Sequence, residues 1–421
     1  MGNQQGRITD DGGRKTEDGP AGRGFGVCAP SSVFRPLKII EITNVDFSLR
    51  HFLLPLMRAL RAQGHEVVGM CAEGALLDDI RAEGFRIIAV PFARRVSPLA
   101  HVRAFLALVR IFRAERPDLV HAHMPISGFL ARAAARVAGV RRVGYTCHGF
   151  LFNQAGGWTR RGTGLLMEWI AGPMTDVFLT VSANEARDAH RLGICRRAVA
   201  VGNGRSAALF RPDPPARERI RADLGTPPDR VVVVAVSRLV RPKGYLELAA
   251  AMRSVPDAEL WVVGERLESD RGEDIAALLD AAGLGPRLRR LGYRRDIPAL
   301  LAAADIFALP SYYEGLPMSV IEAMLTGLPV VASDLPGTRE QVLPGVTGLL
   351  VPPRDPAALA AALAGLAGDP PRRAALGEAG RHRALALFEE TAVIERTLDL
   401  LGVATPPSER YAHADSPRLE G

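Results

Sequence analysis

The amino-acid sequence predicts an α/β protein with two doubly wound domains, each a parallel sheet covered by helices on both faces. At 421 residues the chain exceeds the roughly 250–300 residues at which a single hydrophobic core stops growing. Short apolar runs alternate with helical patterns in two separate series, which is typical of parallel sheets. Prolines at positions 212, 214 and 215 mark a linker between the two series. We therefore expect domains at 36–212 and 213–385. A helix at 386–403 follows, and whether it crosses back to the first domain stays open.

The first series begins with the order strand, helix, strand, helix, strand. The expected strands are LKIIEIT (37–43), HEVVGMC (65–71), FRIIAVPF (85–92), DLVHAH (118–123), RVGYTCH (142–148) and DVFLTVS (176–182). Helical patterns are expected at 52–64, 75–84 and 129–138, and another from near Asn184. Strands that are apolar along most of their length are buried on both faces, so the predicted sheet is parallel.

The second series repeats this alternation. Its expected strands are VVVVAVS (231–237), AELWVVG (258–264), LRRLG (288–292), DIFALPS (305–311) and PVVAS (329–333), with helices at 245–252, 275–282, 298–304 and around 315–325. Ligands of doubly wound sheets bind beyond the carboxyl ends of the strands. Functional residues are therefore expected in a cleft across which the two domains face each other.

The chain ends and the cysteines point to a cytoplasmic protein. Segments 1–35 and 404–421 are polar, rich in glycine or proline and without apolar periodicity, so we expect disordered tails there. The N-terminus lacks the apolar region of a secretory signal, and arginines interrupt every apolar stretch before it is long enough to span a membrane. Four widely spaced cysteines without a C-x-x-C pair argue against a zinc site or a disulfide framework.

Positive charge is concentrated in the first half of the chain. Residues 36–212 carry 24 cationic and 13 acidic side chains, whereas residues 213–402 carry 22 and 26. The helix expected at 99–116 places Arg103 and Arg110 on one side, seven residues apart. Contact with an anionic membrane and an ordinary solvated surface both explain these features. The segment 156–170, with its tryptophans and arginines, is a candidate for the mouth of an acceptor site.

Two cations follow the first strand of the second series. In VVVVAVSRLVRPKG the strand ends at Ser237, and Arg238 and Lys243 come before the next helix. A pair of cations at the carboxyl end of a strand is suited to a diphosphate. Lys243 is one of only three lysines against fifty arginines in the chain, which favours a specific need for a compact ammonium group. A basic loop is also common on a solvated surface, so this feature alone does not identify a site.

A helix with two glutamates follows the fourth strand of that series. In PSYYEGLPMSVIEAMLTG the helix is expected to begin near Pro317 and to end before Gly327, with its free N–H groups directed into the cleft. That end is a candidate phosphate site. Glu314 comes just before the helix and Glu322 lies inside it, so the two carboxylates can reach different depths of one pocket. Glutamates near a helix start are also ordinary capping residues.

His148 follows a strand of the first half, in GYTCHGF. A single histidine at a strand end is more often structural than catalytic, but its predicted position in the cleft favours a functional role.

These segments together resemble glycosyltransferase family four, whose members are retaining enzymes of GT-B fold. The resemblance is carried by SRLVRPKG, PSYYEGLP and SVIEAMLTGLPVVASDLPGTRE, and it extends over about residues 36–400. HAHMPISGF and HGFLF are similar to the branch that builds bacterial surface polysaccharides such as lipopolysaccharide or capsule. That branch implies a nucleotide-sugar donor, typically a UDP-sugar, and a saccharide or lipid-linked acceptor. Nucleic acid is not expected as a partner.

The resemblance implies a role for each candidate residue. Arg238 and Lys243 would hold the donor diphosphate, and the amides around Gly315 and Leu316 would cap its distal phosphate. Glu314 would bind hydroxyls of the transferred sugar, and His148 would lie beside that sugar. Glu322 would bind the ribose, and the base would be bordered by Gly264, Tyr293 and Arg294. The implied reaction retains the anomeric configuration by attack on the same face. It uses no metal and no cofactor, since cations and the helix N-terminus stabilise the leaving diphosphate.

The sequence departs from the family at two places and leaves other readings open. The loop after the first strand reads TNVDFSLRHF instead of a Gly-Gly turn, and Arg205 and Ser206 follow Asn203-Gly204 where relatives read Ile/Val-Asp. VGNGRSA matches a weak dinucleotide-binding pattern, but no helix is expected to open there. A sugar-nucleotide epimerase or a non-catalytic nucleotide-sugar binder on the same fold stays an alternative.

Overall fold

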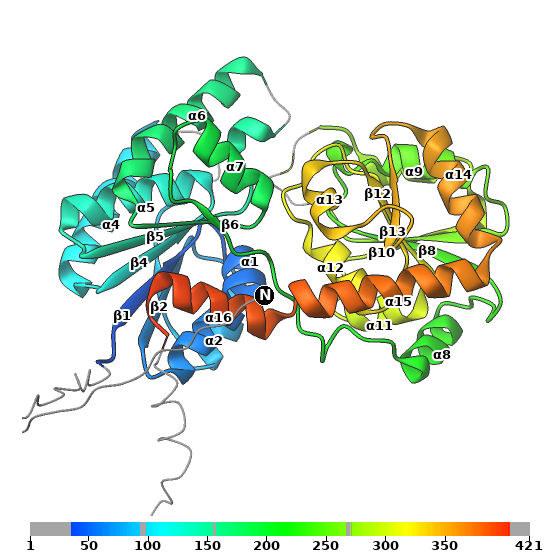
Figure 1. Cartoon of the computed structure of the whole chain (residues 1–421), viewed down its shortest axis with the longest axis horizontal. Helices are drawn as coiled ribbons and strands as arrows, with labels where there is room; N and C mark the ends of the chain where they lie inside the picture. The colour runs from blue at the N-terminus through cyan, green and yellow to red at the C-terminus, as the bar shows by residue number, and fades with distance from the viewer. Residues whose placement is uncertain (1–34, 93–97, 155–156, 267–269, 271, 405–421) are drawn as a thin grey trace, which may run out of the picture. The chain divides into compact units, whose positions relative to one another are not determined.

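The computed structural model describes residues 35–92, 98–154, 157–266, 270 and 272–404 (Figure 1). The disordered tails expected at 1–35 and 404–421 lie, apart from one residue each, outside this part of the chain. None of the helices in the described ranges combines the length and apolar character that a membrane crossing requires.

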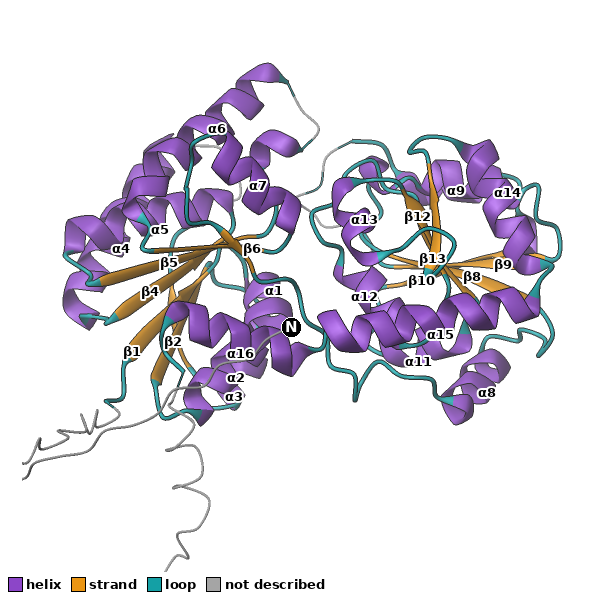
Figure 2. Cartoon of the chain, viewed as in Figure 1, coloured by secondary structure: helices purple, strands orange, loops and turns teal. Residues whose placement is uncertain are grey.

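The first half of the chain forms a parallel sheet with seven strands among the described residues (Figure 2). Its elements are β1 (Lys38–Ile42), α1 (Asp46–Ser48), the π-helical turn η1 (Leu49–Leu53), α2 (Leu54–Ala62), β2 (Glu66–Cys71), α3 (Leu77–Ala82), β3 (Arg86–Ala89), α4 (Pro98–Glu115), β4 (Leu119–His123), α5 (Pro125–Ala138), β5 (Arg142–Cys147), η2 (Leu151–Asn153), α6 (Trp158–Ala171), η3 (Gly172–Met174), β6 (Val177–Thr180), α7 (Ala183–Arg191) and β7 (Val199–Ala200). The strand order is β3-β2-β1-β4-β5-β6-β7, so the order reverses between β1 and β4.

The second half forms a parallel sheet with six strands in the described ranges. Its elements are α8 (Pro214–Asp223), β8 (Val231–Val236), η4 (Arg241–Lys243), α9 (Tyr245–Met252), β9 (Ala258–Val263), α10 (Ile275–Asp280), η5 (Gly285–Arg287), β10 (Leu288–Gly292), α11 (Ile297–Ala303), β11 (Ile306–Leu309), α12 (Met318–Leu325), β12 (Val330–Ser333), α13 (Pro336–Gln341), β13 (Gly348–Val351), α14 (Pro356–Ala367), α15 (Pro370–Leu387) and α16 (Glu390–Leu401). The order β10-β9-β8-β11-β12-β13 reverses between β8 and β11.

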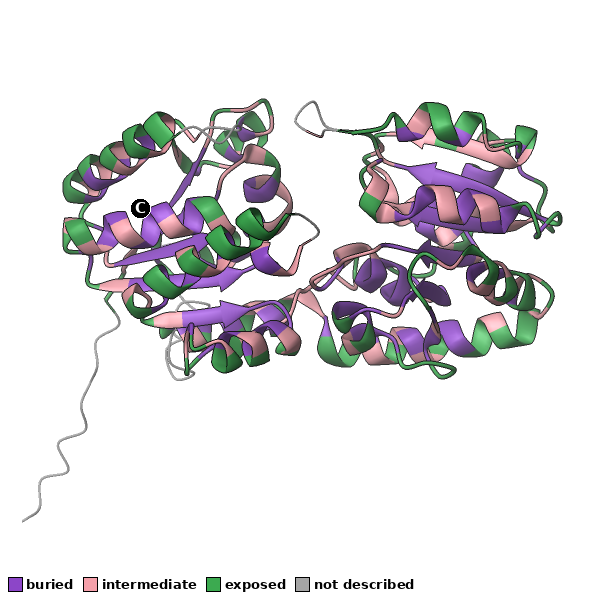
Figure 3. Ribbon diagram, turned by 90° about the horizontal axis from the view of Figure 1, so that it is seen from above, coloured by how far each residue is buried: buried purple, intermediate pink, exposed green. Residues whose placement is uncertain are grey.

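Each sheet is buried on both faces, which confirms the predicted fold class of two doubly wound parallel sheets. Consecutive residues of one strand belong to opposite cores: Ile39 packs with Leu119 on one face, and Ile40 packs with Val120 on the other. Figure 3 shows the same layering, with buried strands between helices whose outer faces are exposed. The carboxyl ends of the strands at each reversal are the places where doubly wound sheets bind ligands.

The linker prediction at prolines 212–215 is wrong in part. Helix α8 begins at Pro214, with Asp213 as its N-cap and the Asp213 carboxylate accepting a hydrogen bond from the Ala216 amide at 3.0 Å. Proline is favoured in the first turn of a helix because its missing N–H has no partner there anyway. Pro214 and Pro215, which were expected in a linker, therefore lie in the first turn of a helix.

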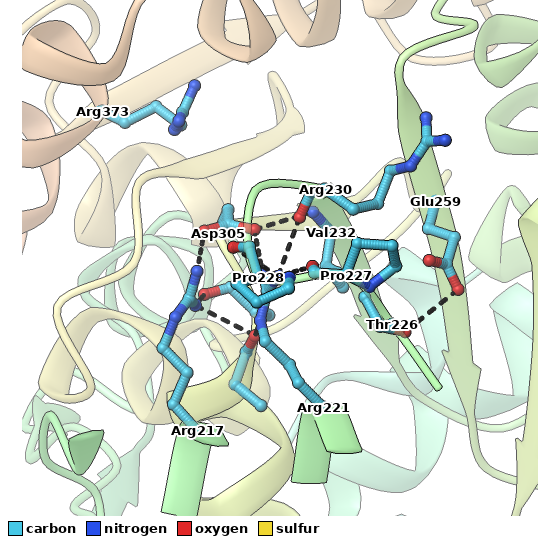
Figure 4. Close-up of polar contacts among 12 residues, drawn as sticks. Arg217, Arg221, Thr226, Pro227, Pro228, Arg230, Val232, Glu259, Asp305 and Arg373 are labelled. Atoms are coloured by element: carbon cyan, nitrogen blue, oxygen red, sulfur yellow. Dashed lines mark hydrogen bonds and ion pairs between the residues drawn. The ribbon is translucent and has the colours of Figure 1, made fainter. Parts of the chain in front are cut away.

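Asp305, just before β11, fixes α8 to the second sheet (Figure 4). Its carboxylate accepts from Arg217 at 2.7 Å, from Arg221 at 2.6 Å and from the amide of Val232 in β8 at 2.8 Å. Arg221 is buried, and it also donates to three carbonyls of the loop from Pro227 to Arg230. This network holds α8, β8 and β11 together and contains none of the candidate site residues, so its role is structural.

Helix α16 packs on the first sheet. Leu398 and Leu401 are buried in the same core as Ile39 and Leu119, and α16 contacts α2. On the way back, Arg205 and Glu389 form a parallel β-bridge. We propose to keep the domain division at 212/213 with 386–403 as a separate closing helix, because the cores of the second sheet take only Val181 and Phe210 as buried members from the described chain before that point.

Candidate functional site

Lys243 and Glu314 meet where the second sheet reverses its strand order. Lys243 Nζ lies 2.6 Å from Glu314 Oε1, and the same oxygen accepts from the Ser311 hydroxyl at 2.6 Å. Lys243 ends η4, after β8, and Glu314 lies in the loop after β11. The structure thus brings together an ammonium and a carboxylate that are 71 residues apart in the sequence.

Gly244 allows this close approach of the two loops. Its φ is +73°, and a Cβ at this position would lie 1.9 Å from the carbonyl oxygen of Pro310. Only glycine avoids both the backbone strain and the clash. Arg238, by contrast, is about half exposed and pairs with Asp270 at 2.6 Å, so its guanidinium is not directed at the Lys243–Glu314 pair.

The loop 314–317 also contacts the first half of the chain. A Cβ on Gly315 would lie 3.8 Å from the carbonyl oxygen of His148 and 3.6 Å from Glu185 Oε1. The carbonyl of Leu316 accepts a hydrogen bond from the Asn203 side chain at 2.8 Å. Helix α12 starts immediately afterwards, with Pro317 as its N-cap. The loop before α12 therefore lies against the backbone at His148, and Met318 at the start of α12 lines the same pocket as His148.

Glu322 is buried in α12 and faces Arg205. Arg205 Nε lies 2.7 Å from Glu322 Oε1, although this N–H is not aligned for a hydrogen bond with any of the described residues. Burial raises the pKa of Glu322, and the nearby guanidinium opposes that rise. Arg205 stands at the position where the sequence departs from its family, and its pairing with Glu322 gave no signal in the sequence.

The residues expected around the base occupy the loops after β9 and β10. Gly264 has φ +127°, a Cβ there would lie 2.1 Å from the Ser237 carbonyl oxygen, and its amide donates to Gly292 at 2.8 Å. The Tyr293 amide donates to Glu265 at 3.0 Å, and its side chain is half exposed. Gly264, Glu265 and Gly292 line one pocket.

Arg294 does not join this pocket through its guanidinium. It forms a bidentate pair with Asp296 at 2.8 and 2.6 Å, and its hydrogen bonds lower the pKa of the Asp296 carboxyl.

His148 lines a second pocket, together with residues from η1, α2, the segment 201–205 and α16. Its Nε2 lies 3.1 Å from Nδ1 of His123, and its ring stacks on that of Phe52 with centroids 6.4 Å apart. Burial lowers the pKa of His148 well below its usual range, with a further contribution from the neighbouring histidines. The imidazole is neutral at pH 7 as a result.

Behind His148 lies a buried polar network that the sequence interpretation missed. Glu41 of β1 contacts His121 Nδ1 at 3.0 Å and His123 Nε2 at 2.8 Å, and His121 Nε2 contacts the Thr146 hydroxyl at 2.8 Å. Burial alone would raise the pKa of Glu41, but the two histidines lower it to about 2. Burial also lowers the pKa of His123 to about 4. A glutamate inside the apolar strand KIIEI and two histidines inside LVHAH are the signals in the sequence that pointed to this network.

Glu41, His121 and His123 are also the one group of metal-ligating side chains in the described residues whose ligand atoms gather within 4.8 Å. Their separations of 2.8 and 3.0 Å are those of hydrogen bonds between nitrogen and oxygen. Protons therefore account for the contacts, and a bound cation would have to displace them. The segment VGNGRSA, the weak dinucleotide pattern, forms no helix and instead lines the pocket beside His148.

Two family models match the chain, one for each half. The model described as Glycosyltransferase Family 4 matches residues 51–209, and that described as Glycosyl transferases group 1 matches residues 216–383.

Relatives with curated names are similar over most of their length. The UDP-Gal:alpha-D-GlcNAc-diphosphoundecaprenol alpha-1,3-galactosyltransferase of Escherichia coli is 30% identical over 67% of this chain and 75% of its own. The lipopolysaccharide core biosynthesis glycosyltransferase LpsD of Rhizobium meliloti is 29% identical over 87% of this chain and 99% of its own.

Solved structures share the fold. Anabaena Alr3699/HepE, crystallised with UDP and glucose, aligns with a TM-score of 0.77 at 22% identity, covering 87% of this chain and 100% of its own. WaaG, a glycosyltransferase involved in lipopolysaccharide biosynthesis, aligns with a TM-score of 0.67 at 18% identity, over 87% of this chain and 100% of its own. At these identities the likeness concerns the fold alone.

Proposed function

We propose, from the premise that this chain belongs to glycosyltransferase family four, that it moves a sugar from a UDP-sugar to a saccharide or lipid-linked acceptor. The transfer would retain the anomeric configuration. The product would be part of a bacterial surface polysaccharide, such as lipopolysaccharide or capsule. The names of the Escherichia coli and Rhizobium meliloti relatives support this class of pathway.

The Lys243–Glu314 pair beside the N-terminus of α12 is the observation that carries this proposal. The ammonium and the amides of Gly315 and Leu316 suit a diphosphate, and Glu314 suits the hydroxyls of the transferred sugar. A diphosphate that binds Lys243 competes with Glu314 for the ammonium and so frees carboxylate lone pairs for those hydroxyls. Arg238 would leave its ion pair with Asp270 and bind the donor phosphates instead.

The proposed mechanism needs no metal ion. The leaving diphosphate would be stabilised by Lys243 and the helix N-terminus, which are already in place, and by Arg238 once it leaves Asp270. The chain also contains no Asp-x-Asp pair, the motif with which metal-dependent transferases hold a divalent ion. His148 would lie beside the transferred sugar.

The nucleotide base is proposed to be uracil, with guanine as the rival. The HepE structures contain UDP or UDP-glucose, and the Escherichia coli relative is named for UDP-Gal. A mannosyltransferase of Mycolicibacterium smegmatis that is named GDP-mannose-dependent is 36% identical over 60% of this chain. Glu322 would bind the ribose after exchanging its contact with Arg205, and Gly264, Tyr293 and Arg294 would border the base.

We further propose that the protein works in the cytoplasm, at the inner face of an anionic membrane. Helix α4 exposes Leu99, Val102 and Leu106 together with Arg103 and Arg110. Helix α6 exposes further tryptophans and arginines over the segment considered for the acceptor mouth. Apolar and cationic side chains on one surface suit a lipid surface that carries a lipid-linked acceptor.

Thermal stabilisation by nucleotides in EDTA tests the donor site. UDP or a UDP-sugar at 100 times its Kd stabilises by about 2.7 kcal/mol, which raises Tm by about 3 °C in a protein of this size. Lys243→Ala and Glu322→Ala should lose this shift. Lys38→Ala is the matched control, because Lys38 also forms a close ion pair, 2.7 Å from Glu115, in the first half of the chain.

Three outcomes would contradict the proposal: stabilisation only by NAD(P), stabilisation by none of the nucleotides, or an undiminished shift in Lys243→Ala. A shift by GDP instead of UDP would change the donor and keep the site. Release of UDP that depends on an added acceptor separates a transferase from an epimerase or a non-catalytic binder.

A further inference from the structure

We propose that Glu41 is a positioning residue that sets, through His123, which ring nitrogen of His148 carries the proton. His148 then offers the lone pair of Nδ1 as a hydrogen-bond acceptor to a hydroxyl group of the bound sugar or acceptor. The choice of that ligand rests on the proposed function, whereas the proton arrangement does not.

The register of the first sheet places this network on one face. Glu41 is the register partner of His121, and His123 is the register partner of Thr146. Because side chains alternate along a strand, His121 and His123 point to the same side, as do Thr146 and His148. The polar groups therefore form a row across β1, β4 and β5 at their carboxyl ends, where the strand order reverses.

The protons can be assigned from the ends of this row. Glu41 is ionised, so both of its oxygens only accept, one from His121 Nδ1–H and one from His123 Nε2–H. His123 is neutral at pH 7 and has one proton to give, which is therefore on Nε2. Its Nδ1 must then accept from His148, 3.1 Å away. The single proton of neutral His148 is thus on Nε2.

This assignment leaves Nδ1 of His148 as an acceptor at the edge of the candidate site. No described residue donates a hydrogen bond to it. Loop 314–317 approaches the backbone at His148, and Met318 at the start of α12 lines the same pocket as His148. A hydroxyl can donate its proton to such a nitrogen, whereas the opposite tautomer would present an N–H and could only donate to the hydroxyl oxygen. Glu41 itself is fully buried and cannot touch a ligand.

Nitrogen NMR of the protein labelled with ¹⁵N-histidine tests the proton arrangement without any substrate. We expect His123 and His148 both to be Nε2–H tautomers at pH 7 and to remain so down to about pH 5, with signals assigned from single histidine substitutions. An Nδ1–H tautomer or an imidazolium at His148 at pH 7 would overturn the proposal. So would a stoichiometric metal found by elemental analysis that disappears with Glu41→Leu.

Transfer kinetics test the consequence for the reaction. Glu41→Leu replaces the carboxylate by a side chain of similar size in a strand of apolar neighbours, and kcat should fall about tenfold, the value of one hydrogen bond to the reacting sugar. KM for the donor should change less than kcat. Glu41→Gln should recover part of the loss, because in one amide orientation the carbonyl still accepts from His123.

Glu259→Gln is the matched control. Glu259 is a buried carboxylate of β9 in the second half, and it also bridges two donors, Thr226 at 3.3 Å and Arg289, without contacting the histidine row. Its Tm should fall while kcat is kept. An unchanged kcat in Glu41→Leu, or an equal loss of kcat in Glu259→Gln, would show that the row does not act on His148. Absence of any transfer would contradict the proposed function and leave the NMR result to decide the tautomer.

Discussion

Two buried glutamates of the first half show how local partners decide the state of a residue. Glu41 has a donor for each oxygen, and its pKa is lowered to about 2 despite burial. Glu185 of α7 is just as buried, but neither of its oxygens has a partner at hydrogen-bond geometry among the described residues. Burial raises the pKa of Glu185 to about 8. Its carboxyl is therefore protonated at pH 7 and lies against Gly315 of the loop 314–317.

The raised pKa of Glu185 predicts a loss of stability as pH rises from about 4.5 to 8. Since its folded pKa of about 8 is above the unfolded value, the folded state holds one more proton than the unfolded state between about pH 4.5 and 8. The free energy of unfolding should fall as pH rises through this window, by a few kcal/mol in total. Glu185→Gln removes the titrating proton. The free energy of unfolding of the variant, relative to that of the wild type, should therefore be higher at pH 9 than at pH 5. Urea unfolding at both values measures it.

Asp176→Asn is the control for this experiment. Asp176 is a carboxylate of the same half that accepts from Arg136 at 2.7 Å and from the Val143 amide at 2.7 Å. The free energy of unfolding of this variant, relative to that of the wild type, should change little between pH 5 and 9. An equal response of the two variants would show that Glu185 is not held protonated.

At the scale of elements, the turn from β8 to α9 positions the candidate phosphate site. Gly244→Ala introduces a Cβ that would lie 1.9 Å from the Pro310 carbonyl oxygen, at a φ of +73°. We expect a loss of more than about 2 kcal/mol of unfolding free energy and a weaker UDP-dependent rise in Tm, because Lys243 is pushed away from the loop after β11.

Gly225→Ala isolates the effect of the backbone angle alone. Gly225 has φ +62° and nothing within 4 Å of its virtual Cβ. This variant should cost about 1 kcal/mol and keep the response to UDP. If both variants respond alike to UDP, the turn does not position Lys243.

The elements also show which parts of the fold can be predicted from sequence. Buried parallel strands read as apolar runs, so β4, β5, β8, β9 and β11 were placed within one or two residues. Strand β13 and helices α13–α15 were not predicted, since GLLV is short and follows a turn, and the alanine-rich segment after it carries little polar contrast. Proline misled the prediction at α8, where it begins a helix instead of a linker.

The candidate site also contains residues that the sequence can reveal and residues that it cannot. Lys243, Glu314 and Gly315 lie in local motifs, and motifs can be read along the chain. Glu41, His121 and His123 meet only through strand register, which no single sequence reveals. Arg205 and Glu322 are 117 positions apart, and their contact depends on how the segment 201–205 passes α12.

At the scale of the whole molecule, the excess of positive charge in the first half predicts binding to anionic membranes. Arg103→Glu with Arg110→Glu reverses two exposed charges beside exposed Leu99, Val102 and Leu106. Binding to vesicles that contain anionic lipid should fall by about tenfold or more at low salt, at roughly 1 kcal/mol or more per charge. Cosedimentation measures it.

Arg372→Glu, an exposed arginine of α15 in the second half, is the control and should bind as the wild type does. The membrane proposal is wrong if wild-type protein does not bind anionic vesicles at low salt, or if the control loses as much binding as the double variant.

The β-bridge between Arg205 and Glu389 has a consequence for modularity. The chain leaves the first sheet just after Arg205 and returns to it at Glu389, and there the Arg205 amide donates to Phe388 at 3.0 Å while the Glu389–Arg205 bridge is completed by the Glu390 amide at 3.1 Å. The outgoing and returning segments therefore lie side by side. Residues 206–388 form one continuous insertion whose two ends meet at this bridge, so recombination between relatives at these two ends would exchange the second half in one piece and leave the first half and its closing helix intact.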